Sequence, residues 1–279
     1  MNDWPIGLST GCFYQTSIFD CLKQIRETGF SILEICSFPA HLDYHDYEAV
    51  RRAGELIREL DLEPYSFHAP FAEYIDITSI DDEVRNKSLS EIKTAAAAAA
   101  EIGARYFVIH PGPENSDIPN EQRLQRMDNA ADTLNQLVKH CHQLGIGLML
   151  ENMLPHLFFG RARDVLWILG ALETTEVGIC LDTGHAYLSG DLYTVVHKLS
   201  GHLRMIHASD NCGNRDDHLP PGEGDIAWET LVTQLAQLHF RGTVILEIAG
   251  TPNMHETLER ARVAKQFLCQ LARSSDPNT

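Results

Sequence analysis

Six side chains that commonly bind metal ions follow short apolar runs in this sequence. The apolar runs lead into His68 ("YSFHAPF"), His110 ("FVIHPGP"), Glu151 ("LMLENML"), Asp182 ("CLDTGH"), His207 ("RMIHASD") and Glu247 ("ILEIAG"). A buried carboxylate or imidazole without a partner costs several kcal/mol, on the order of 2–7 for a neutral polar group and more for a charge. A single residue of this kind is usually a hydrogen-bonded polar group of the core. Six that converge predict a cation between them.

Three further candidates lie beyond these runs. His185 follows Asp182 by three residues, across what reads as a Thr-Gly turn in "CLDTGHAYLSGD". Asp216 and His218 are two residues apart, so both side chains face the same way if the segment is extended. We expect Asp182 to join the core cation and His185 to lie several Å outward. There His185 either joins Asp216 and His218 around another zinc ion or stays metal-free and binds a substrate hydroxyl. In the alternative interpretation, Asp182 only caps a helix, His185 is a loop residue, and Asp216 and His218 belong to a solvated acidic loop with Asp210, Asp217, Glu223 and Asp225.

These residues converge only if their strands are parallel and share one end. Short apolar runs alternate with longer amphipathic stretches eight times, without a long linker, which predicts an α/β protein built as a single (β/α)8 TIM barrel over residues 1–279. Active sites of such barrels lie at the C-terminal ends of the strands. The predicted strands are 6–9, 32–36, 64–67, 106–109, 147–150, 177–181, 204–206 and 244–246. The predicted helices are 19–28, 47–60, 82–102, 120–144, 163–172, 192–200, 226–238 and 255–272.

Composition limits the classes of partner. The net charge is −17, which disfavours phosphate backbones and anionic lipid, so nucleic acid is not the expected partner. No apolar stretch approaches the roughly 18 residues of a membrane span, and the N-terminus lacks the pattern of a secretory signal. The seven scattered cysteines are typical of reduced thiols in a cytoplasmic protein.

The motifs "FHAPF", "IHPG", "LEN", "LDTGH" and "DDHLPPGEGDI" resemble those of the xylose isomerase-like barrel superfamily, which joins sugar isomerases and epimerases to endonuclease IV. The resemblance covers nearly the whole chain. It implies a core metal site shared by the epimerases, formed by Glu151, Asp182, His207 and Glu247. It also implies that His68, His110, His185, Asp216 and His218 match the additional ligands with which endonuclease IV holds three zinc ions.

Two mechanisms follow, and the sequence favours the first. In an isomerase or epimerase, one divalent cation, Mn²⁺ or Zn²⁺, stabilises an enediolate of a sugar or polyol-like substrate. Glu151 and Glu247 then act as base and acid, and His185 holds a substrate oxygen. In a multinuclear zinc phosphodiesterase, up to three zinc ions bind a hydroxide, which attacks a phosphodiester bond of DNA.

The surroundings of the site decide between these mechanisms. Near the barrel mouth the chain offers only Arg161, Arg163 and Arg215, among many acidic residues, which favours a small, unphosphorylated substrate over DNA. A metal-binding protein without catalysis is the third interpretation, although it leaves the two glutamates unexplained. A homo-oligomer is compatible with the sequence, which does not fix the oligomeric state.

Overall fold

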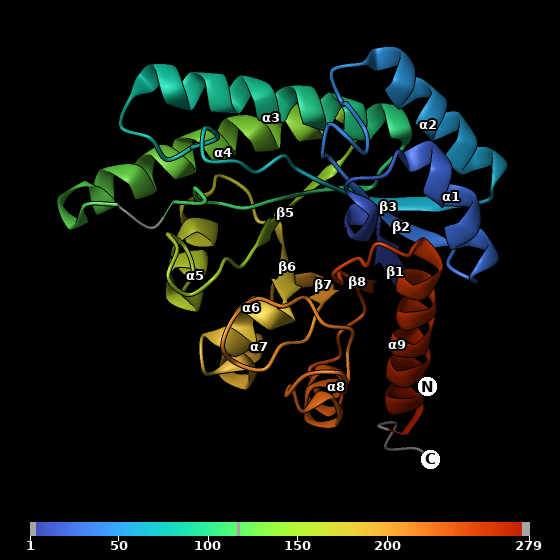
Figure 1. The fold of residues 1–279 in the computed structure, drawn as a ribbon. Coiled ribbons are helices and arrows are strands. Elements are labelled where there is room, and N and C mark those ends of the chain that lie inside the picture. The colour runs from blue at the N-terminus through green and yellow to red at the C-terminus, as the bar shows by residue number, and fades with distance from the viewer. Residues whose placement is uncertain (1–3, 116–117, 275–279) are drawn as a thin grey trace.

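The computed structural model describes residues 4–115 and 118–274, and it confirms the predicted barrel. Within these residues, eight parallel strands pair in sequence order, and β8 closes the barrel onto β1 (Figure 1). The strands are β1 (Ile6–Ser9), β2 (Ile32–Cys36), β3 (Glu63–His68), β4 (Tyr106–Ile109), β5 (Gly147–Glu151), β6 (Gly178–Asp182), β7 (Leu203–Ala208) and β8 (Thr243–Leu246).

Helices surround the strands on the outside of the barrel (Figure 1). They are α1 (Ile18–Glu27), α2 (Tyr47–Glu59), α3 (Asp82–Ile102), α4 (Arg123–Leu144), α5 (Ala162–Ala171), α6 (Thr183–Leu188), α7 (Leu192–Leu199), α8 (Trp228–Gln237) and α9 (Met254–Ser274), with short 3-10 turns η1 (Thr10–Phe13) and η2 (Asn120–Gln122). None of the described helices is long and apolar enough to cross a membrane.

The sequence did not predict helix α6, and the Thr-Gly turn expected after Asp182 is wrong. The side chain of Asp182 accepts a hydrogen bond from the backbone N–H of His185 at 2.6 Å, which is the N-cap arrangement that starts a helix. Periodicity did not reveal α6 because it is only six residues long and has no second turn of apolar residues. His185 therefore lies on a helix rather than on a turn.

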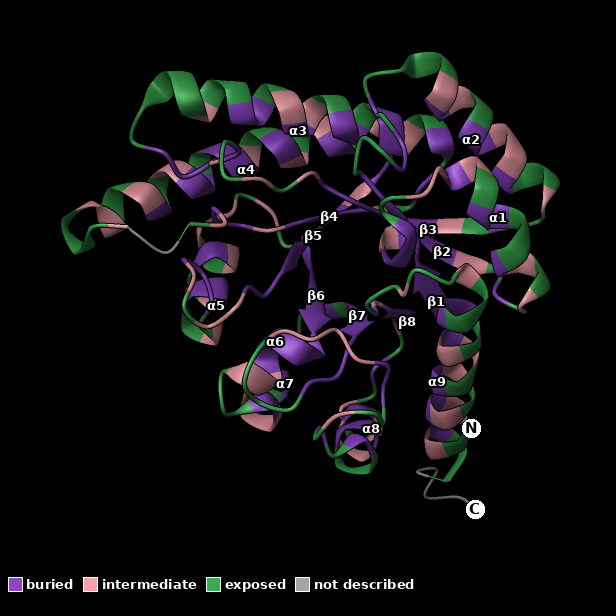
Figure 2. Cartoon of the chain, viewed as in Figure 1, coloured by how far each residue is buried: buried purple, intermediate pink, exposed green. Residues whose placement is uncertain are grey.

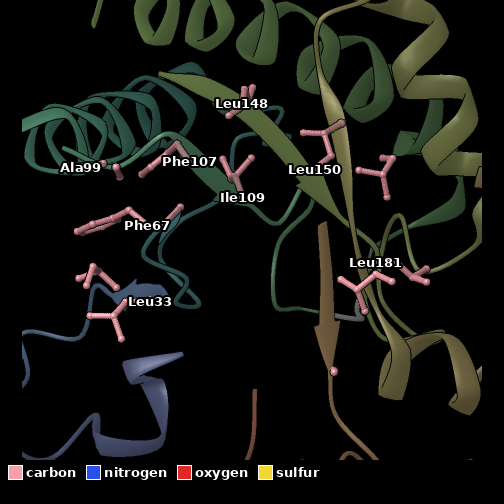
Figure 3. Packing of buried hydrophobic residues seen from close by; sticks show 14 of the residues in the cluster. Leu33, Phe67, Ala99, Phe107, Ile109, Leu148, Leu150 and Leu181 are labelled. Carbon is pink, nitrogen blue, oxygen red and sulfur yellow. The ribbon is translucent and has the colours of Figure 1, made fainter. Parts of the chain in front are cut away.

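Two apolar layers position the strand ends. The outer layer packs the strands against the helices, and Figure 3 shows Phe67, Phe107 and Leu148 in this layer, with Ala99 of α3 beside the strands. The inner layer fills the barrel and contains Tyr65, Val108, Met149, Cys180, Met205 and Ile245. Figure 2 shows the strands buried and the outer helix faces exposed.

Side chains of a strand alternate between its two faces, so residues two apart point the same way. Met149, Cys180, Met205 and Ile245 point into the barrel, and so must the residues two positions later. Those residues are Glu151, Asp182, His207 and Glu247. The inner apolar layer thus forms the floor beneath the predicted ligands.

Candidate metal centre

The core of the candidate site consists of Glu151, Asp182, His207 and Glu247, from the ends of the last four strands. One ligand atom from each lies within 4.8 Å of the others. His207 is central, because its Nδ1 atom is 3.2 Å from Glu151 Oε1 and 3.1 Å from Glu247 Oε2. Three carboxylates and one imidazole therefore surround a common point at the C-terminal end of the barrel.

A second group lies beside the core and contains His185, Asp216 and His218. Asp216 Oδ2 is 3.2 Å from His185 Nε2 and 2.9 Å from His218 Nε2. Asp182 and His185 thus fall in different groups, although their positions in the sequence differ by three.

The remaining two predicted residues meet the other oxygen of Glu151. His68 Nε2 is 3.0 Å from Glu151 Oε2, and His68 also forms a candidate group with Glu151 and His207. His110 Nε2 is 3.5 Å from the same oxygen, while its Nδ1 atom is 2.6 Å from Glu114. His110 is in none of the candidate groups found among the described residues. Glu151 therefore lies between His207, which faces its Oε1 atom, and the pair of His68 and His110, which face its Oε2 atom. A carboxylate in this position could bridge two ions.

Most of these histidines are oriented by a backbone carbonyl. The Nδ1 atom of His68 lies 2.8 Å from Ala69 O, that of His185 lies 2.9 Å from Asn152 O, and that of His218 lies 3.0 Å from Glu247 O. Because a carbonyl can only accept, Nδ1 carries a proton in each ring, and Nε2, which faces the carboxylates, is the nitrogen left to bind a metal ion once it loses its proton. Histidines that bind metals are oriented by outer partners of this kind.

Asp182 combines the two functions that the sequence presented as alternatives. One carboxylate oxygen caps α6, while the side chain also contributes to the core group. Asn152 of the "LEN" motif fixes its backbone, since the amide accepts from Asp182 N at 2.8 Å and donates to Asp182 O at 3.0 Å. Capping and a place in the metal group are therefore compatible.

The donor set fits a divalent cation. Three buried atoms that face these groups, His207 Nδ1, Glu247 Oε2 and Asp216 Oδ1, make no hydrogen bond. Buried polar atoms nearly always have a partner, and a cation would supply one here. A carboxylate-rich core with one imidazole suits Mn²⁺ or Mg²⁺, and the added histidines of the second group suit Zn²⁺.

The groups perturb each other's protonation in the metal-free protein. Burial alone would raise the pKa of Glu247, but the nearby His207 and His218 together lower the pKa to about 2. Burial would also raise the pKa of Glu151, yet His207 and His110 hold that pKa well below its usual range. For Asp182, burial dominates and raises the pKa to about 6. Glu151 and Glu247 are therefore anionic at neutral pH, as metal ligands and bases must be.

Sequence reasoning missed Glu34 and misread Asp210. Glu34 lies in the middle of β2, is fully buried, and contacts His207 Nε2 at 2.9 Å. The signal was a single carboxylate in the apolar strand "ILEIC", inside the run rather than at its end. Asp210, expected to be solvated, is also fully buried and accepts hydrogen bonds from Trp228 Nε1 and the backbone of Gly222 and Ile226. These hydrogen bonds of Asp210 stabilise the loop that carries Asp216 and His218.

An aromatic wall, formed by Tyr14, Phe38 and Phe71, was not predicted either. Phe71 packs against His68 and His110 with ring centroids 5.3 and 5.2 Å apart, and Phe38 and Tyr14 continue the row. All three aromatic side chains are partly exposed. His156, on the loop after Glu151, is exposed and takes no part in the candidate groups.

The closed barrel and the polar residues at its C-terminal end define an α/β barrel with a candidate metal centre. The chain belongs to the xylose isomerase-like TIM barrel family, which matches residues 22–270 and confirms the predicted resemblance.

Three relatives illustrate its range. The chain is 28% identical over 275 residues to an uncharacterized protein of Methanocaldococcus jannaschii, covering 95% of this chain and 90% of that one. It is 30% identical over 209 residues to a probable endonuclease 4 of Mycobacterium leprae, covering 71% and 75%. The solved structure of a D-tagatose 3-epimerase-like protein superposes with a TM-score of 0.85 at 25% identity, covering 98% and 99%.

Proposed function

We propose that the protein is a divalent-metal-dependent isomerase or epimerase of a small, unphosphorylated sugar or polyol-like substrate. The observation that carries the proposal is the pair of carboxylates Glu151 and Glu247, which approach His207 Nδ1 from different strands at 3.2 and 3.1 Å. An epimerase needs one group to remove a proton from the carbon next to the carbonyl and another to return a proton to it. Two carboxylates beside one cation can fill these two roles. The likeness to the D-tagatose 3-epimerase-like structure supports this choice.

Glu151, Asp182, His207 and Glu247 would hold the catalytic ion. A cation bound there would polarise the substrate carbonyl and stabilise the negative charge of an enediolate. Mn²⁺ and Zn²⁺ are the ions that we propose, with one in the core and up to three if the histidine groups are also filled.

The two glutamates differ in their access to solvent, and this difference supports a separate role for each. Glu151 is 1% exposed, so its anionic carboxylate removes the proton from the carbon next to the carbonyl in a site without bulk water. The side chain of Glu247 is 23% exposed, so it can take a proton from solvent and deliver it to the opposite face of that carbon. His185 Nε2, directed at Asp216, would bind a substrate hydroxyl. The aromatic wall would cover an apolar face of the substrate.

An endonuclease-like zinc phosphodiesterase is the second candidate. The full set of nine ligand-competent residues and the 30% identity to a probable endonuclease 4 favour it. The charge of −17 and the state of the nearby arginines argue against it, because Arg215 pairs with Asp217 and Arg163 lies 3.7 Å from Asp164. A duplex would need unpaired cations along this face.

The seven cysteines support a cytoplasmic location, since all are free thiols and five are buried. We also propose that residues 1–279 form one domain, because the closed barrel uses strands from both ends of the chain.

The proposal is tested by assaying protein loaded with Mn²⁺, Co²⁺ or Zn²⁺ against a panel of unphosphorylated ketopentoses and ketohexoses, with their phosphates as a second panel. A duplex with an abasic site is the competing substrate. We expect a new epimer or isomer in the first panel, dependent on the metal and abolished by a chelator. Incision of the duplex without sugar turnover would establish the phosphodiesterase instead.

A further inference from the structure

Glu34 is a buried carboxylate outside the set of predicted ligands. It lies on β2, whereas His207 lies on β7, and β8 and β1 separate these two strands in the closed barrel. The Glu34 side chain therefore crosses the barrel interior to reach His207. Its Oε2 atom accepts hydrogen bonds from His207 Nε2 at 2.9 Å and from Ser66 Oγ at 2.9 Å.

Folding alone gives no reason for this residue. Glu34 is fully buried, and its Oε1 atom has no hydrogen-bond partner. Desolvating a carboxylate with one oxygen unpaired costs stability, and an apolar residue of similar size would avoid that cost. A polar residue in such a place is better explained by what it does to its neighbour.

We infer that Glu34 is a positioning residue that fixes the tautomer and ring orientation of His207 and thereby strengthens the core metal site. A carboxylate can only accept, so the proton of a neutral His207 must lie on Nε2, and Nδ1 is left with a lone pair. Nδ1 is the atom that faces Glu151 and Glu247, and it makes no hydrogen bond. The inference rests on the metal site of the proposed function, although not on its substrate.

The chemistry of the pair explains why an acid is used. His68, His185 and His218 are each oriented by a backbone carbonyl through Nδ1, whereas His207 is oriented through Nε2 by a carboxylate. An anionic acceptor makes the imidazole a more basic ligand than a carbonyl does. Ser66 is opposite Glu34 in the β2–β3 register, and its hydroxyl holds the carboxylate in place.

The test measures metal binding and the tautomer of His207, neither of which needs a substrate. Zn²⁺ affinity is measured by competition with a chelator for the wild type, Glu34→Gln, Glu34→Leu and Ser66→Ala. Nitrogen NMR of the metal-free protein labelled at histidine, recorded along a pH titration until His207 is neutral, reports its tautomer, with His207→Asn identifying the signal. Asp164→Asn is the matched control, because Asp164 is a buried carboxylate on α5 that pairs with Arg123 outside the candidate groups.

We expect Glu34→Leu to weaken Zn²⁺ binding about 10–100-fold, as loss of an outer partner does in other metal sites, and to release the Nε2–H tautomer of His207. Glu34→Gln keeps an acceptor but loses the charge, so its effect should be smaller and in the same direction. Ser66→Ala loosens Glu34 without removing it, so Zn²⁺ binding should weaken less than in Glu34→Leu, whereas Asp164→Asn should bind Zn²⁺ as the wild type does. Wild-type affinity together with an unchanged tautomer in a folded Glu34→Gln or Glu34→Leu protein would overturn the inference. Failure of every sugar assay would leave these measurements unaffected.

Discussion

Replacement of Glu247 by Gln separates catalysis from folding at this site. The buried Oε2 atom of the Glu247 side chain makes no hydrogen bond. The backbone N–H of Glu247 donates to Ala208 O, and its carbonyl accepts from His218 Nδ1. Gln keeps the size of the side chain and leaves these backbone contacts in place. We therefore expect the metal-free variant to fold but to lose some thermal stability, because Gln cannot provide the charge that lies 3.1 Å from His207 Nδ1.

The expected loss of activity follows from the role of the carboxylate. With its pKa near 2, Glu247 is an anionic ligand and a proton carrier at neutral pH, and Gln is neither. Removal of a general acid or base lowers turnover by about 10²–10⁴-fold, equivalent to about 3–5 kcal/mol in the activation barrier. The core group retains two carboxylates and His207, so metal should still bind, although less tightly.

The assay compares kcat and KM of metal-saturated Glu247→Gln with the wild type, with the metal content measured on the same sample. Glu259→Gln is the control, since Glu259 is an exposed residue of α9 that pairs with Arg262. An unchanged kcat at full metal occupancy, or a rise in KM alone, would remove Glu247 from the chemical step.

Three further results are expected. In His185→Ala the core metal should remain and KM should rise, as measured by elemental analysis and kinetics; three bound zincs in the wild type, one of them lost in the variant, would favour the phosphodiesterase. Asp210→Asn should loosen the loop that carries His218, seen as faster hydrogen exchange there, and unchanged exchange would deny Asp210 this role. Burial opposes protonation of His185 and His110, but neighbouring carboxylates raise the pKa of His185 to about 9 and that of His110 to about 10. Because these values exceed the unfolded value of about 6.5, the stabilisation of the metal-free protein is complete below that pH and is lost as the pH rises through 9 to 10; a melting temperature that stays flat over this range would contradict it.

The barrel and its strand ends were predictable because they depend on local pattern. Apolar runs such as the one before Asp182 mark strands, and parallel strands in a closed barrel bring their C-terminal ends together. The order of these runs along the chain is therefore enough to place Glu151, Asp182, His207 and Glu247 at one end of the molecule.

The parts that were missed depend on contacts between distant segments. Glu34 acquires its significance only when the barrel closes and β2 faces β7 across the interior, 173 residues away in sequence. Asp210 lies in a loop whose composition is that of a solvated segment, yet its carboxylate accepts hydrogen bonds from the Trp228 indole and three backbone amides. Helix α6 is too short for periodicity and depends on the cap at Asp182.

In the proposed reaction, carboxylates move a proton at the substrate carbon beside a metal-polarised carbonyl. The most direct measurement is turnover of the active sugar in D₂O, with the product analysed by NMR and mass spectrometry. Removal of the proton by Glu151 and return of a solvent-derived proton by Glu247 predict one deuterium on the reacting carbon of each product molecule. A product that retains the original hydrogen, with no deuterium at that carbon, would contradict the account.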